Sequence, residues 1–363
     1  MGRTVRSGPD RRHRATGEAV EFDLMSGAST WSESARLATE LERVGFSGML
    51  YTETSQVPWM QIAAAATAAP TLRFATGIAV AFPRSPMVSA ATAWELAHNT
   101  GGRFRLGLGS QVKAHIQRRY GAEFAPPGPR LRDYVLAVKA CFRAFRGDEK
   151  LDHDGPYYRL NLLPPQWAPP RHAYGDIKVD ISAVGPYMTR MAGEVADGVH
   201  VHPFHSMPYI RKRLLPAVAA GVALAGRDTS EVDLIVPVFA VPGDTHEERA
   251  PLIEAAKTQI AFYGSTPNYA FQFDDLGFEG TTARLGERLR AGEIPGMAAL
   301  ITDEMLEHFA VVAPWDEIAN RLVERYAGVA TRIVSYLAAE SIRRDPHVVD
   351  RWGEVARAVR GAS

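Results

Sequence analysis

Strand-like and helix-like segments alternate from Phe22 to the end of the chain, and this alternation constrains the fold more than any other feature. Eight segments are short and largely apolar, as strands buried in a parallel sheet are, and segments with helical spacing follow them. The predicted strands lie near residues 22, 49, 73, 104, 178, 199, 234 and 333. The pattern predicts an α/β protein with a (β/α)8 TIM barrel, whose chemistry would occupy the carboxyl ends of the strands. A doubly wound sheet is the alternative, but it would seldom need eight parallel strands.

Two regions interrupt the alternation. After the fourth strand come a long loop and a stretch rich in proline and aromatic residues, 151–175, and after the seventh strand residues 264–300 break the pattern. Segments of that length are too long for plain connections between barrel elements. We therefore expect residues 21–363 to form a single barrel domain with insertions after strand 4 and strand 7. Residues 1–20 are polar and rich in arginine, and we expect a flexible basic N-terminal arm.

Charge and hydropathy exclude several classes of partner. The chain has 41 basic and 41 acidic side chains, so no net field favours nucleic acid. No apolar run approaches the roughly 18 residues of a membrane helix, and no apolar segment follows Arg11 and Arg12 as in a secretion signal. The single cysteine, Cys141, lies in an apolar run and is expected to be a buried hydrophobic residue. These features predict a cytoplasmic protein with no membrane and no nucleic-acid partner.

The stretch from Ile177 to His202 has the pattern of a strand, a turn, a helix and a strand. A Gly-Pro step at Gly185 and Pro186 begins the helix, because proline at the first helical position loses an amide that had no partner. The unpaired amides of a helix N-terminus and its partial positive charge favour an anion. The segment is therefore a candidate phosphate site, although a plain βαβ connection has the same pattern.

The expected strand ends carry few charges. Glu53 is the one acidic side chain there, and an acid in an apolar pocket suits proton transfer, although a hydrogen-bonded structural role is equally compatible. His200, His202 and His205 form HVHPFH, but other metal ligands are missing at the remaining strand ends, so no metal is expected. A run with Lys113, His115, Arg118 and Arg119 follows strand four; it forms either a solvated face or a site for an anionic tail or substrate. A pocket at these strand ends, with few charged side chains, suits a flat aromatic cofactor.

Six segments of the chain match the pattern of a known family. The chain resembles the bacterial-luciferase-like flavin and deazaflavin oxidoreductases, and most closely the branch assigned to coenzyme F420. The matching segments, in the order of the family, are YTETS, ATGIAVAFPRSP, GGRFRLGLGSQVKAHIQRRYG, SAVGPYMTRMAGEVADGVHVHPF, AFYGSTPNY and LITDEM.

The resemblance implies positions for the cofactor. It implies a non-proline cis peptide after strand three that bulges against the ring, and a phosphate between the turns after strands four and five. The matching residues are Gly77 and Ile78 for the bulge, Gly109, Ser110 and Gln111 for the first turn, and Ala183, Val184, Gly185, Pro186 and Tyr187 for the second. Some deazaflavin dehydrogenases have a glutamate where this chain has Val112, so Glu53 and His115 become the candidates for handling the proton.

The expected function is that of an oxidoreductase that uses F420 for hydride transfer to or from a small organic substrate. Two alternatives stay open: a monooxygenase dependent on reduced FMN, and a flavin-binding barrel without catalysis. The resemblance also implies a homodimer.

Overall fold

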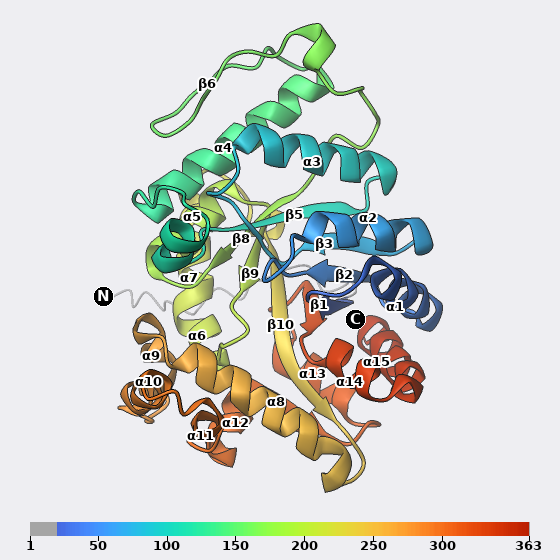
Figure 1. The fold of residues 1–363 in the computed structure, drawn as a ribbon, viewed down its shortest axis with the longest axis vertical. Coiled ribbons are helices and arrows are strands. Elements are labelled where there is room, and N and C mark those ends of the chain that lie inside the picture. The colour runs from blue at the N-terminus through green and yellow to red at the C-terminus, as the bar shows by residue number, and fades with distance from the viewer. Residues whose placement is uncertain (1–19, 363) are drawn as a thin grey trace, which may run out of the picture.

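Eight parallel strands close into a barrel in the computed structural model, which describes residues 20–362. The chain runs around the barrel in sequence order, and helices cover its outside (Figure 1). The barrel strands are β1 (Glu21–Ser26), β2 (Gly48–Tyr51), β3 (Arg73–Thr76), β5 (Phe104–Gly109), β8 (Val179–Ala183), β9 (Gly198–Val201), β10 (Asp233–Pro242) and β12 (Arg332–Ser335).

The last strand closes the barrel. β12 pairs in parallel with β1, where Arg332 lies opposite Glu21, and with β10, where Arg332 lies opposite Ile235. The predicted TIM barrel is therefore confirmed, with all eight predicted strands in place. The predicted arm over residues 1–20 lies outside the described residues except for Val20.

Helices connect successive strands and bury one face each against the barrel. Thr30 caps the first helix with a capping box to Glu33, and Gly45 ends that helix with a φ of 99°, a conformation that glycine adopts at little cost. The helices on the barrel are α1 (Trp31–Val44), α2 (Pro58–Ala68), α3 (Pro86–Asn99), α4 (Pro127–Arg146), α5 (Pro186–Val195), α6 (Met207–Tyr209), α7 (Leu215–Leu224), α8 (His246–Gly264), α13 (Ile318–Tyr326), α14 (Ala338–Arg344) and α15 (Val349–Gly361).

The core lies between the strands and these helices. The side chains of Trp94 and Trp352 are among its largest buried members, and Trp352 of α15 stacks on Phe22 of β1 with ring centroids 6.5 Å apart. The final helix thereby covers the first strand. Cys141 is buried in α4, as predicted.

The two predicted insertions lie at opposite ends of the long axis (Figure 1). The first carries a small hairpin of β6 (His153–Asp154) and β7 (Arg159–Leu160). The second contains α9 (Phe271–Asp274), α10 (Thr281–Arg290), α11 (Ile294–Ala298) and α12 (Asp303–Phe309). It ends in β11 (Ala310–Ala313), which the sequence pattern did not predict and which pairs in parallel with the carboxyl half of β10.

Two predicted elements are interrupted. The apolar run from Leu72 to Val80 has the pattern of one strand, but β3 stops at Thr76 and the strand resumes as β4 (Ala79–Val80), with the cis peptide between Gly77 and Ile78 in the break. The sequence pattern over residues 207–225 indicates one helix, but in the structure a π-helical turn at Ile210–Leu214 lies between α6 and α7. Within residues 20–362, no helix has the length and apolar character needed to cross a membrane.

Candidate functional site

A cavity of about 680 Å³ opens at the carboxyl ends of the barrel strands. Its size is within the usual range of cofactor sites. It is lined by Met25, Thr52, Glu53, Thr54, Gly77, Ile78, Ser110, Gln111, Val112, Ser182, Ala183, Val184, Gly185, Met188, His200, Val201, His202, Pro203, Pro237, Tyr263, Asn268, Tyr269 and Tyr336. A cleft of about 860 Å³ against β11, outside the barrel, contains none of the predicted site residues.

One wall of the cavity is the break between β3 and β4. The peptide between Gly77 and Ile78 is cis, as the resemblance implied. The carbonyl oxygen of Ile78 accepts a hydrogen bond of 3.2 Å from the backbone amide of Glu53, and the amide of Gly77 donates to the Tyr51 carbonyl over 2.8 Å. The break is therefore tied to the neighbouring strand β2 and forms a fixed surface toward the cavity.

A second wall combines the turn after β5 with the turn after β8. Gly185 is the N-cap residue of α5, and no side chain caps the amides of that helix end. A Cβ atom built at Gly185 would have no heavy atom within 4 Å, so the protein leaves open space in front of the helix. Ser110 and Gln111 line the same cavity, and Gln111 has a φ of 56°, which few residues other than glycine adopt. An uncapped helix end that faces open space suits an anion such as a phosphate.

Three predicted cofactor residues do not line the cavity. A Cβ atom at Gly109 would lie 2.6 Å from Cδ1 of Ile78 and 2.7 Å from Oγ of Ser182, so this glycine permits close packing behind the wall. Pro186 begins α5. Tyr187 is 43% exposed and its ring covers Gly128 of α4, so it contacts the outer helices and not the cavity. These residues support the site without facing it.

Glu53 lies in the cavity wall, but its carboxylate is fully engaged. Oε1 accepts from Nη2 of Arg84 at 2.6 Å, and Oε2 accepts from Nη1 of Arg84 at 2.9 Å and from the amide of Val80 at 2.8 Å. The Glu53 side chain is 2% exposed and that of Arg84 16%. A buried, bidentate ion pair holds both side chains in place. This arrangement favours the structural interpretation of Glu53: it fixes the turn between β3 and β4.

The structure does not bring His115 into the cavity. His115 begins a π-helical turn, His115–Arg119, and its side chain is exposed. Lys113 and Arg118 are exposed on the same loop, while a guanidinium nitrogen of Arg119 donates to the carbonyl of Thr54 at the cavity rim. The loop therefore offers positive charge beside the mouth, but no group that reaches into the cavity to transfer a proton.

The three histidines of HVHPFH have different surroundings. His205 is buried and hydrogen-bonds to the His202 carbonyl at 2.8 Å and to Oη of Tyr326 at 3.1 Å. His200 and His202 line the cavity. Burial lowers the pKa of His200 to about 4 and the pKa of His202 to about 3, so both imidazoles are neutral at neutral pH.

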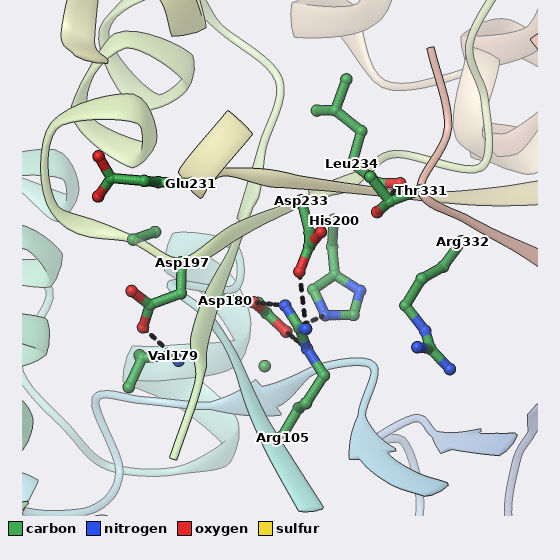
Figure 2. Close-up of polar contacts among 12 residues, drawn as sticks. Arg105, Val179, Asp180, Asp197, His200, Glu231, Asp233, Leu234, Thr331 and Arg332 are labelled. Atoms are coloured by element: carbon green, nitrogen blue, oxygen red, sulfur yellow. Dashed lines mark hydrogen bonds and ion pairs between the residues drawn. The ribbon is translucent and has the colours of Figure 1, made fainter. Parts of the chain in front are cut away.

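Below the cavity, charged side chains fill the amino-terminal end of the barrel (Figure 2). Arg105 donates to both carboxylate oxygens of Asp180 at 2.6 and 2.9 Å, and to Asp233 at 2.8 Å. Burial alone would raise the pKa of Asp180, but the guanidinium of Arg105 outweighs it and holds that pKa below its ordinary value. Nε2 of His200 lies 3.8 Å from Asp180, which places this ion-pair network directly beneath the cavity floor.

Several cavity residues were missed in the sequence. Tyr263 lies at the end of α8, Asn268 and Tyr269 lie in the short turn that begins the insertion, and Tyr336 follows β12. The segment AFYGSTPNY contains the first three and was recognised only as a matching segment. Its density of aromatic residues within a loop was the available signal.

The chain is similar to known proteins over most of its length. A family model described as luciferase-like monooxygenase matches residues 12–332. An uncharacterised protein of Mycobacterium tuberculosis is 38% identical over 310 residues, which cover 85% of this chain and 91% of that protein.

Solved structures share the fold at low sequence identity. The coenzyme F420 dependent tetrahydromethanopterin reductase from Methanopyrus kandleri superposes with a TM-score of 0.76 at 20% identity, over 93% of this chain and 98% of the reductase. The EDTA monooxygenase from Chelativorans sp. superposes with a TM-score of 0.69 at 17% identity, over 94% of each chain. Both confirm the barrel. Because the family match spans most of the sequence, the chain belongs to the luciferase-like monooxygenase family.

Proposed function

We propose that the protein is an oxidoreductase that uses the deazaflavin coenzyme F420 to transfer hydride to or from a small organic substrate. The observation that carries the proposal is one cavity that combines the Gly77–Ile78 wall with the uncapped N-terminus of α5. A flat ring with a phosphate needs both features. The choice of F420 over FMN rests on the likeness to the F420-dependent reductase of Methanopyrus kandleri and on the exposed cations Lys113 and Arg118 near the cavity mouth.

The described residues divide into those that would hold the ring and those that would hold the phosphate. Gly77 and Ile78 form the surface for the ring, while Ser110, Gln111 and Gly185 surround the space for the phosphate. When bound, the deazaflavin supplies the hydride chemistry, and the protein contributes orientation and exclusion of water. Glu53 and Arg84 hold the ring surface in place through their ion pair. From the resemblance we also expect a homodimer.

Titration of the purified protein with F420 and, separately, with FMN tests the proposal. We expect saturable F420 binding, followed by fluorescence, and oxidation or reduction of bound F420 by at least one compound from a panel of alcohols, ketones and enones. Tight FMN binding without F420 binding would replace the proposal with the monooxygenase alternative. F420 binding with no redox change across the panel would favour a barrel without catalysis.

Glu53→Gln separates the two interpretations of Glu53. A proton-transfer role predicts that turnover falls far more than cofactor affinity. The ion pair with Arg84 predicts that both fall together, because the substitution leaves Arg84 without its counter-charge and loosens the turn that faces the ring. We expect the second result, with affinity for F420 reduced by about tenfold or more, equivalent to about 1.4 kcal/mol. The dissociation constant and kcat of the variant, measured side by side, decide between them.

The double variant Glu53→Gln with Arg84→Met is the matched control. It removes the unpaired cation, so it should recover part of the thermal stability that Glu53→Gln loses. A single variant with native stability and affinity but greatly reduced kcat would restore the proton-transfer interpretation.

A further inference from the structure

The cavity has one wall that the proposed cofactor does not explain. It is lined by His202, which follows β9, and by three tyrosines, Tyr263, Tyr269 and Tyr336. Tyr263 lies at the end of α8, and Asn268 and Tyr269 lie in the short turn that begins the insertion. This wall is therefore built largely where the chain leaves the repeating barrel pattern, and such loops usually determine specificity.

The hydrogen bonds of His202 fix which of its ring nitrogens carries the proton. The backbone amide of Phe204 donates to Nδ1 of His202 at 3.1 Å, so Nδ1 is an acceptor. Burial, together with the neighbouring His205, lowers the pKa of His202 to about 3, so the ring is neutral near pH 7. A neutral imidazole whose Nδ1 accepts must carry its proton on Nε2.

The donor on Nε2 has no acceptor among residues 20–362. The ring is nevertheless held firmly: its centroid lies 4.7 Å from that of Tyr263, at an interplanar angle of 81°, and 4.7 Å from that of Tyr269, at 52°. An N–H group that is fixed in a cavity wall and lacks a partner within the protein favours a ligand that brings the acceptor.

The rest of this wall is aromatic and uncharged. The hydroxyls of Tyr263 and Tyr336 hydrogen-bond to each other at 2.7 Å, and burial raises the pKa of both groups, so neither ionises near neutral pH. Among the lining residues only Glu53 is charged, and Arg84 neutralises it. A charged substrate would therefore lose its hydration without gaining a counter-ion here.

We infer that His202, with Tyr263, Tyr269 and Tyr336, forms the substrate subsite, and that it selects an uncharged, planar compound whose carbonyl-type oxygen accepts a hydrogen bond from Nε2–H of His202. The inference rests on the proposed function in that it assigns the remainder of the cavity to the substrate. The tyrosine rings provide flat apolar area for stacking, and His202 provides the one directional contact.

The first test concerns the tautomer and needs neither cofactor nor substrate. In nitrogen-15 NMR spectra of the histidine-labelled protein, the His202 ring should show the Nε2–H form at pH 7 and remain neutral at pH 5. A protonated ring or the Nδ1–H form at pH 7 would overturn the inference.

The second test compares four small probes on the protein with and without cofactor: acetophenone, its near-isostere α-methylstyrene, benzoate and benzylamine. Wild-type protein should bind acetophenone about three- to tenfold more tightly than α-methylstyrene, the range of one neutral hydrogen bond. With cofactor present, so that the anion-binding turn is filled, benzoate and benzylammonium should bind more weakly than either. Equal affinity for the ketone and the alkene, or tighter binding of a charged probe to the protein with cofactor, would overturn the inference.

Two substitutions at His202 make the test specific. His202→Phe should abolish the preference for the ketone, whereas His202→Gln should retain part of it because the amide keeps a donor. His347→Gln, at an exposed histidine outside the cavity, should bind the probes as the wild type does. A preference that survives in His202→Phe would contradict the assignment. Because the probes are measured without cofactor as well, failure of F420 binding would be seen separately.

Discussion

Gly185→Asp is expected to weaken cofactor binding by at least about 100-fold while the barrel remains folded. The new carboxylate would stand at the uncapped N-terminus of α5, in the space assigned to the phosphate, where two like charges about 4 Å apart repel by several kcal/mol. Gly185→Ala should have a smaller effect, about tenfold, because a methyl group fills space without adding charge. Dissociation constants from fluorescence titration give both values.

The fold should tolerate these changes. Gly185 has φ −76° and ψ 161°, which any residue adopts, and a Cβ atom there would contact no protein atom within 4 Å. Gly185→Ala should therefore be as stable as the wild type or slightly more stable, since alanine restricts the unfolded chain. Gly286→Ala is the matched control: this glycine lies in α10, outside the cavity, with room for a Cβ atom. Unchanged cofactor affinity in both Gly185 variants would remove the phosphate from this turn.

Arg105→Met is expected to have the largest effect on stability, a loss of about 3 to 5 kcal/mol in the free energy of unfolding, as when one partner of a buried ion pair is removed. The variant leaves Asp180, whose side chain is fully buried, without its bidentate partner. Gly198 shows how tightly this network is packed, because a Cβ atom there would lie 2.4 Å from a carboxylate oxygen of Asp180. Urea unfolding measures the loss.

Two further variants test whether the stability lost in Arg105→Met comes from the buried charge of Asp180. Arg105→Met combined with Asp180→Asn should recover much of the stability, because the buried charge is then removed along with its partner. Arg321→Met breaks an exposed pair with Glu317, whose side chains are 57% and 50% exposed, and should cost at most about 1 kcal/mol. Equal losses in Arg105→Met and Arg321→Met would show that the network contributes no more than a surface pair.

The sequence predicted the architecture well because its signals are local. The spacing of apolar residues within a few positions separates strands from helices, and local signals, the capping box at Thr30 and the glycine at Gly45, begin and end α1. The element that the sequence pattern did not predict, β11, depends on a contact with a strand that is distant in the sequence. β11 has too few residues to show a period, and it is a strand because the long β10 extends past the barrel and offers an edge.

Only those parts of the candidate site that depend on local sequence features could be predicted. Gly185 and Ser110 belong to turns that local sequence features indicate, and both residues line the cavity. Whether Glu53 is free or paired depends on Arg84, which is 31 positions away, and the hydroxyl contact between Tyr263 and Tyr336 spans 73 positions.

The sequence by itself thus determined the barrel, the order of its strands and the helix end that suits an anion, since periodicity and caps depend on neighbouring residues. Only the tertiary structure decided which side chains face the cavity and which already have partners. In the folded protein Glu53 forms an ion pair with Arg84, and His115 lies on an exposed turn outside the cavity. His202 packs against Tyr263 and Tyr269 in the cavity wall. Such pairings depend on strand register and on the docking of helices and insertions, which sum many long-range contacts that no local pattern encodes.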